Sequence, residues 1–200
     1  MVMDTAPLGY FDRELRITSV RVLPGQYYAT QGDGSISTVL GSCVATCLWD
    51  PVRRIGGMNH FMLPGEAAAP TSPWALSARF GINAMELLIN TMVHLGADRR
   101  RFVAKVFGGA RVLQGFERFD VGARNSEFVL SFLREEGIEL LGQDLLGECP
   151  RKVHFFPATG KVQLKRLSLR QDDPVQRQEQ AYLQGLSGQS GSGDVEIFSR

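Results

Sequence analysis

Short hydrophobic segments separated by glycine and proline fill the first third of the chain. Segments of this kind, rich in β-branched and aromatic side chains, are typical of strands. Pro24-Gly25, Asp50-Pro51 and Pro64-Gly65 mark turns between them. Residues 44–49 also fit a helix that opens at Cys43, because so short a segment has no distinguishing period. The predicted strands cover residues 17–23, 27–30, 36–40, 44–49 and 55–63.

Two longer segments repeat their hydrophobic residues at helical spacing. The first helix is predicted over residues 74–95 and is followed by Gly96. The second helix is predicted to begin with Asn125 as its N-cap and to stop at Gly137. The apolar face of the first helix is predicted to hold Phe80, Ala84, Leu87, Leu88, Met92 and Leu95. Further strands are predicted at residues 102–107, 138–141, 153–156 and 161–167, the last two as a hairpin.

This order of elements predicts a single α+β domain. Strands that lie before, between and after two helices favour a mixed sheet with helices covering one face. We assign residues 15–168 to this domain and residues 1–14 to an irregular N-terminal segment. Residues 169–200 are rich in Gln, Gly and Ser, so we interpret them as a flexible tail.

Composition narrows the class of protein. The chain has 200 residues, 44% of them hydrophobic and 22% charged, as expected of a globular domain rather than a disordered one. A net charge of +1 gives no signal for nucleic-acid binding, and we interpret the basic segment 98–101 as a solvated turn, with partner docking as the minor alternative. No apolar segment approaches the ~20 residues of a membrane helix, and residues 1–10 lack a signal-peptide pattern. The odd number of cysteines argues against a disulfide framework, so we expect a cytoplasmic protein.

Candidate chemistry centres on Cys43 and His60. Cys43 follows Gly41-Ser42, and His60 follows the glycine pair Gly56-Gly57. A thiolate is the attacking species in cysteine catalysis, and a nearby imidazole can activate the thiol and later return a proton. Backbone N–H groups exposed at the first glycine turn would stabilise an oxyanion beside it. The competing interpretation is a buried structural thiol, since free cysteines are often buried.

Other candidate sites are weaker. Cys43, Cys47 and His60 offer three zinc ligands, but their spacing fits no usual Cys-x-x-Cys pair and no fourth ligand is evident. Gly108-Gly109 is too sparse for a nucleotide-binding loop, and we expect it to serve backbone geometry near the site. We therefore expect no cofactor and no metal, and we assign no chemical role to the remaining residues with reactive side chains, Cys149, His94 and His154.

Several gapless segments resemble a known family. The two longest are residues 38–51 (TVLGSCVATCLWDP) and 56–64 (GGMNHFMLP). Shorter matches are residues 23–28, 105–110, 122–125 and 159–162. Together these segments, spread over about residues 10–167, resemble the CheD family of chemoreceptor glutamine deamidases.

The resemblance implies a fold, an activity and partners. The fold is a layered mixed-sheet α/β sandwich of the type shared with cytotoxic necrotising factor. The activity is hydrolysis of specific glutamine side chains to glutamate on the cytoplasmic helical bundle of methyl-accepting chemotaxis receptors, with release of ammonia. A CheC-type phosphatase is a second implied partner. Non-catalytic binding to receptors or phosphatase remains the alternative, and another cysteine hydrolase, such as a thioesterase, is a third.

The resemblance also implies roles for site residues. Cys43 is the expected nucleophile and His60 its activator. The family carries a threonine six positions before the cysteine that orients the histidine; here Ser37 holds this position and Thr38 follows it. Neighbouring strand residues point to opposite faces, so the two are not interchangeable. We predict that Ser37, which keeps the hydroxyl, fills this role.

Overall fold

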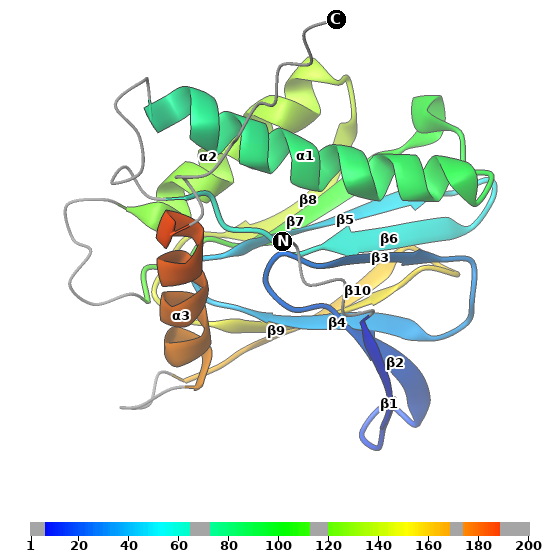
Figure 1. Cartoon of the computed structure of the whole chain (residues 1–200). Coiled ribbons are helices and arrows are strands. Elements are labelled where there is room, and N and C mark those ends of the chain that lie inside the picture. Colours follow the sequence, from blue (N-terminus) through cyan, green and yellow to red (C-terminus); the bar gives the residue numbers. More distant parts are fainter. Residues whose placement is uncertain (1–6, 65–72, 113–119, 169–173, 189–200) are drawn as a thin grey trace, which may run out of the picture.

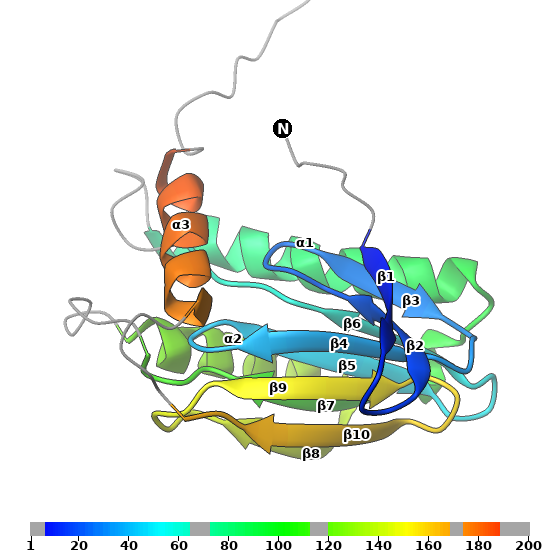
Figure 2. The same ribbon diagram turned by 90° about the horizontal axis from the view of Figure 1, so that it is seen from below.

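The computed structural model describes residues 7–64, 73–112, 120–168 and 174–188. Within them, two mixed five-stranded sheets pack face to face (Figures 1 and 2). The first sheet, in spatial order, consists of β1 (Leu8–Asp12), β2 (Ile17–Arg21), β4 (Ser35–Leu40), β9 (Arg151–Phe156) and β10 (Lys161–Arg166). The second consists of β3 (Tyr27–Thr30), β6 (Ile55–Asn59), β5 (Val44–Asp50), β7 (Val103–Gly108) and β8 (Glu139–Leu145).

Two helices complete a three-layer arrangement. Helices α1 (Pro73–His94) and α2 (Val121–Glu135) lie on the outer face of the second sheet (Figure 1). One hydrophobic core fills the space between these helices and the second sheet, and another fills the space between the two sheets. The predicted α+β fold, with helices on one face of a mixed sheet, is therefore confirmed.

Strand β5 is buried on both faces, which explains its nearly continuous hydrophobic sequence. Val44 and Leu48 belong to the core beneath the helices, whereas Ala45 and Cys47 belong to the core between the sheets. Because successive strand residues point to opposite faces, a strand buried on both sides needs apolar residues throughout. This settles the choice left open by the sequence: the segment after Cys43 is a strand.

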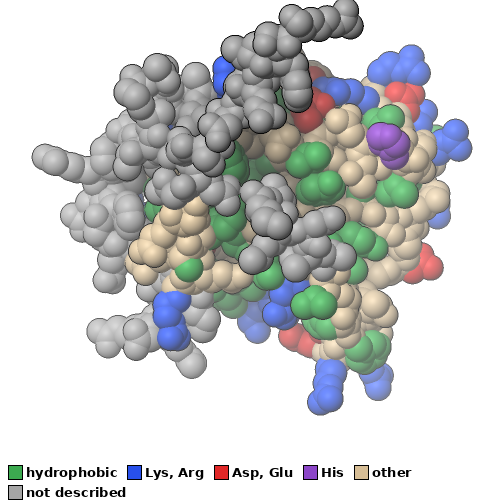
Figure 3. All heavy atoms as spheres, viewed as in Figure 1, with side chains coloured by type: hydrophobic (Ala, Val, Ile, Leu, Met, Phe, Trp, Pro, Cys, Tyr) green, Lys and Arg blue, Asp and Glu red, His purple; other side chains and the backbone are tan. Residues whose placement is uncertain are grey.

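Helix α1 matches its predicted range, but its buried face is rotated. Leu88 and Met92 are buried as expected. The predicted core residues Phe80, Leu87 and Leu95 are instead exposed. Within residues 79–94 of α1, the fully buried large side chains are Met85, Leu88, Ile89 and Met92. The exposed hydrophobic side chains are dispersed over the described part of the face in Figure 3 rather than joined in one patch.

Helix α2 begins earlier than predicted. Asp120 is its N-cap, and its side chain accepts a hydrogen bond from Ala123 N at 2.9 Å. Asn125, the predicted N-cap, is instead a fully buried residue within the helix. The predicted stop is confirmed, since the helix ends at Glu135 and Gly137 adopts a positive φ of 66°.

The predictions for both ends of the chain need correction. Leu8–Asp12 is not irregular but forms β1, which pairs antiparallel with β2. Pro174–Gly188, expected within a flexible tail, forms helix α3 (Figures 1 and 2). Its buried side chains, Glu179, Leu183 and Leu186, recur at helical spacing along one face. Residues 1–6, 169–173 and 189–200, which belong to the same two predictions, lie outside the described residues.

The basic segment forms a short 3-10 helix, η2 (Arg99–Arg101), just before β7. Its ion pairs are internal: Arg101 binds the buried carboxylate of Asp50 at 2.9 Å, and Arg99 binds Glu136 at 2.6 Å. These pairs fasten the turn to the domain. As for membranes, none of the helices in the described ranges has the length and apolarity needed to span a bilayer.

Candidate active site

The loop Gly41–Ser42–Cys43 carries the chain from the first sheet to the second. It follows β4 in one sheet and precedes β5 in the other. Each carbonyl oxygen of this loop accepts a hydrogen bond from the surrounding domain: Gly41 O from Ala110 N at 2.7 Å, Ser42 O from Asn125 Nδ2 at 2.8 Å, and Cys43 O from Gly109 N at 2.8 Å. Hydrogen bonds to its three carbonyl oxygens thus fix the loop on the domain.

Gly108 and Gly109 make this anchoring possible. Both have positive φ, at 113° and 66°. A Cβ atom on Gly108 would lie 2.1 Å from Cys43 O, so no other residue fits there without moving the loop. The expectation that this glycine pair serves backbone geometry near the site is confirmed.

The N–H groups of the same loop converge on one carboxylate. Glu179, from α3, accepts hydrogen bonds from the N–H groups of Gly41 at 2.8 Å, Ser42 at 2.8 Å and Cys43 at 3.1 Å, and from Ser42 Oγ at 2.7 Å. Only 1% of Glu179 is exposed. Successive backbone N–H groups that point at one spot form an anion-binding concavity. The loop therefore presents a donor cluster of the kind that stabilises an oxyanion.

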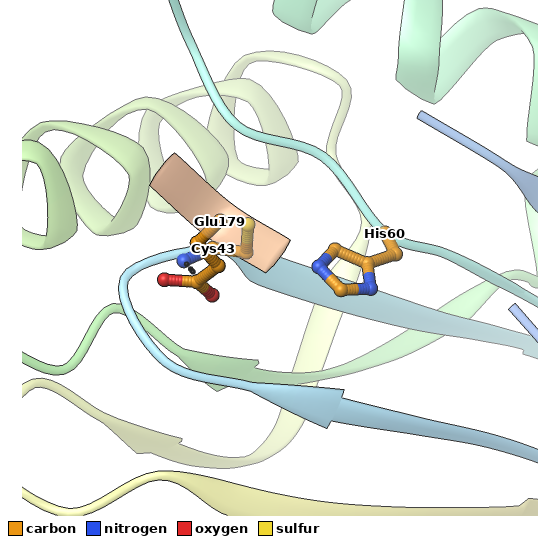
Figure 4. A group of neighbouring side chains, drawn as sticks. All are labelled: Cys43, His60 and Glu179. Carbon is orange, nitrogen blue, oxygen red and sulfur yellow. Dashed lines mark hydrogen bonds between the residues drawn. The ribbon is translucent and has the colours of Figure 1, made fainter. Parts of the chain in front are cut away.

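His60 lies beside this cluster. It directly follows β6, and its backbone pairs with the turn before β3, where Gly25 N donates to His60 O and His60 N donates to Gln26 O. Figure 4 shows the imidazole facing Cys43, with Glu179 next to the thiol. Cys43 Sγ, an imidazole nitrogen of His60 and a carboxylate oxygen of Glu179 all lie within 4.8 Å of one another.

A hydroxyl fixes the tautomer of His60. Thr38 Oγ1 donates to the carbonyl oxygen of Val22 at 2.7 Å and lies 2.8 Å from His60 Nδ1. Since the single hydroxyl proton is used on that carbonyl, Thr38 Oγ1 must accept its second bond from Nδ1–H. The lone pair of the ring is then on Nε2, which is buried and has no hydrogen-bond partner. The imidazole is thereby ready to accept a proton at Nε2.

Ser37, the residue favoured from the sequence for orienting His60, does not contact the imidazole. Its hydroxyl lies 2.9 Å from the Tyr10 hydroxyl, on the outer face of β4. Thr38 shares the inner face of β4 with Ile36 and Leu40, which belong to the core between the sheets. The bond to His60 expected of Ser37 is therefore made by Thr38, because the two residues point to opposite faces.

Burial keeps the thiol and the imidazole uncharged in this arrangement. Burial, followed by the adjacent Glu179 carboxylate, raises the pKa of the Cys43 thiol well above its usual value. Burial likewise lowers the pKa of His60 to about 4. The closed site thus holds a neutral thiol beside a neutral imidazole.

The donor set does not favour a metal. The zinc alternative considered from the sequence is not supported, because among the described residues the ligand atoms that group together are those of Cys43, His60 and Glu179, without Cys47. Both oxygens of Glu179 already accept hydrogen bonds from the loop. N–H groups aimed at a point attract an anion and repel a cation. This chemistry suits a carboxylate or an oxyanion better than a metal ion.

A thiol, an imidazole and a cluster of N–H donors at one end of a layered α/β sandwich define a domain with a cysteine–histidine site. Comparison with known proteins gives the family. Residues 62–166 match the family described as CheD chemotactic sensory transduction. The chain belongs to the CheD family.

Relatives match over nearly the whole chain. A protein of Shewanella oneidensis named probable chemoreceptor glutamine deamidase CheD 1 is 46% identical over 192 residues, covering 96% of this chain and 93% of the relative. A protein of Dechloromonas aromatica with the same name is 48% identical, covering 94% and 93%. A protein of Herminiimonas arsenicoxydans named probable chemoreceptor glutamine deamidase CheD is 47% identical, covering 95% and 94%.

The sequence assigns no site role to Asn125 or Glu179, and for the contact with His60 it favours Ser37 over the alternative, Thr38. The sequence predicts Asn125 as a helix cap, whereas its side chain donates to Ser42 O and accepts from Leu63 N. Glu179 was overlooked because its polar surroundings resembled a tail. The helical spacing from Glu179 to the leucines after it was the available signal.

Proposed function

We propose that this chain is a protein-glutamine deamidase, an amidohydrolase with a cysteine nucleophile, that acts on chemoreceptors. The observation that carries the proposal is the donor cluster of residues 41–43, which binds a glutamate side chain directly beside Cys43 and His60. Glutamate is the product of glutamine hydrolysis. Membership of the CheD family and the names of its relatives support the same activity.

In the first half of the reaction, Cys43 Sγ attacks the side-chain carbonyl carbon of the substrate glutamine. His60 Nε2 takes the thiol proton as the S–C bond forms. The carbonyl oxygen becomes an oxyanion held by the N–H groups of Gly41, Ser42 and Cys43; losing one such donor in other enzymes costs roughly 100- to 1000-fold in rate. His60 then gives the proton to nitrogen, the C–N bond breaks, and ammonia leaves.

In the second half, a water molecule gives a proton to His60 Nε2 and attacks the thioester carbon. The C–S bond breaks, the thiol regains its proton, and glutamate remains on the substrate. Thr38 acts as a positioning residue, since its hydroxyl holds Nδ1–H and leaves Nε2 free throughout. The residues present supply each proton transfer in this sequence.

The partners that fit this activity are the cytoplasmic helical bundles of methyl-accepting chemotaxis receptors. With these partners, the proposed location is the cytoplasm, where a reducing environment would keep Cys43 as a thiol. A CheC-type phosphatase as a second partner stays a prediction from the family resemblance. Neither nucleic acid nor insertion into a membrane has a place in this proposal.

The test is the intact mass of a purified receptor cytoplasmic domain after incubation with this protein. Each deamidated glutamine should raise the mass by about one dalton, because –NH2 is replaced by –OH. The matched control is Cys43→Ala, which should give no gain. Equal masses with and without the wild-type protein, across several receptors, would refute the proposal.

One observation favours a second candidate, a non-catalytic adaptor. Cys43 has 0% exposure, so the site as observed is closed to a substrate. An adaptor would bind the receptor domain in a pull-down and leave its mass unchanged, in wild type and Cys43→Ala alike.

A further inference from the structure

We propose that helix α3 occupies the substrate-binding surface of this protein: Glu179 fills the subsite for the reacting side chain, and a glutamine-bearing receptor helix must displace α3 to dock there. This inference rests on the function proposed above. It adds the location of the substrate-binding surface and the element that closes the site. The occupant of the surface is a segment of the same chain in the resting state, and a receptor helix during turnover.

The contacts of Glu179 are those of a bound product. A glutamate side chain differs from glutamine only in having oxygen in place of the amide nitrogen. Its two oxygens accept bonds from all the loop donors, namely three backbone N–H groups and Ser42 Oγ. A carboxylate accepts at both oxygens, whereas an amide accepts at one and donates at the other. Glu179 therefore satisfies the cluster better than a substrate glutamine would.

The rest of α3 packs as a docked helix. Tyr182, Leu183 and Leu186 lie on the same face as Glu179, and both leucines are buried in the core between the sheets. A Cβ on Gly25 would lie 2.6 Å from the Tyr182 hydroxyl, and a Cβ on Gly41 would lie 2.8 Å from Glu179 Oε2. Both glycines thus leave room for a helix to approach. Figure 2 shows α3 across one end of the sandwich.

This packing defines the chemistry of the external partner. It should be an α-helix that presents a glutamine at the position of Glu179 and apolar or aromatic residues three, four and seven positions later. A helix in a receptor bundle can offer this pattern on one face. The neutral carboxamide would also replace a carboxylate that contributes, after burial, to the raised pKa of the Cys43 thiol. Exchange of the helices would thus make the thiol easier to deprotonate.

Thiol labelling tests the occlusion without relying on turnover. In the full-length protein, a Leu183→Asp/Leu186→Asp double variant should release α3, and iodoacetamide should label Cys43 at least about tenfold faster than in wild type, since labelling requires the site to open. The matched control is Gln184→Asp, at an exposed position of the same helix, which should label like wild type. Cys47, buried between the sheets, should stay slow in all variants and thereby report an intact fold. An unchanged Cys43 rate in a folded double variant would overturn the proposal.

A self-reaction tests the substrate position itself. In Glu179→Gln, the introduced carboxamide lies where the reacting side chain should, so the variant should gain about one dalton as Cys43 hydrolyses it, with a rate independent of protein concentration. Glu179→Gln/Cys43→Ala should keep its mass. If Glu179→Gln deamidates a receptor yet keeps its own mass, the placement is overturned and the proposed function stands. If wild type deamidates no receptor and Glu179→Gln also keeps its mass, the proposed function fails and this inference fails with it.

Discussion

The hydroxyl of Thr38 offers the sharpest test of how the site works. Thr38→Val replaces it with a methyl group of nearly the same size, so packing is kept. The change removes the hydrogen bonds that the hydroxyl makes with the carbonyl of Val22 and with Nδ1 of His60. An unpartnered buried polar group costs about 1–3 kcal/mol. If the loss at Nδ1 falls on the reactive tautomer, turnover should decrease roughly 5- to 150-fold, since about 1.4 kcal/mol corresponds to a factor of ten.

The assay is ammonia release from a receptor cytoplasmic domain under saturating substrate. Thr38→Ser keeps the hydroxyl and should retain most of the turnover number. Ser37→Ala removes the neighbouring hydroxyl on the opposite face and should remain within about twofold of wild type, a difference of under about 0.5 kcal/mol in the activation barrier. The reasoning would be refuted if Ser37→Ala were as slow as Thr38→Val, or if Thr38→Val kept full activity. Urea unfolding of each variant would separate lost activity from lost stability.

Three further predictions concern stability. Asn125→Ala removes two buried hydrogen bonds and should lower the free energy of urea unfolding by about 2–4 kcal/mol. The pKa of His60 is lowered from 6.5 to about 4, so below pH 6.5 the unfolded chain binds a proton that the folded chain does not. The free energy of unfolding should therefore fall by about 3 kcal/mol as the pH falls from 6.5 to 4. In His60→Gln this pH dependence should be absent. Arg101→Ala leaves the buried carboxylate of Asp50 without its guanidinium partner and should lower the free energy of urea unfolding, though by less than for a fully buried pair because Arg101 is 34% exposed; an unchanged free energy of unfolding would contradict this.

The strands were largely predictable from sequence, because both cores need apolar residues at known spacing. Turn residues marked some boundaries correctly: Pro24-Gly25 separates β2 from β3, and Asp50-Pro51 follows β5. The strand predicted over residues 55–63 is too long, since β6 ends at Asn59 rather than at Pro64. The face of α1 was not predictable, since Phe80 and Leu87 satisfy the same period as the buried residues. Which apolar stripe meets the sheet depends on how the helix docks, and local sequence does not contain that information.

The pair Cys43 and His60 was predictable from glycine turns and the family resemblance. The choice between Ser37 and Thr38 was not predictable. The spacing of six positions before the cysteine favoured Ser37, whereas the inner face of β4 is occupied by Thr38. Helix α3 is not predicted for a physical reason: a lone helix that buries one narrow face has a polar composition much like that of a tail. The helix is stabilised by its packing on the domain, and this packing cannot be inferred from amino-acid composition.

Because the loop between β4 and β5 crosses from one sheet to the other, the site contains residues from both sheets. Thr38 belongs to the first sheet, whereas Cys43 and His60 flank strands of the second. The contact between Thr38 and His60 therefore depends on how the two sheets are aligned, and the sheets are held together mainly by side-chain packing. A small sliding of one layer over the other would separate histidine from its hydroxyl while every strand stayed paired. Loss of turnover should thus be the earliest sign of a loosened sandwich, ahead of any change in backbone spectroscopy.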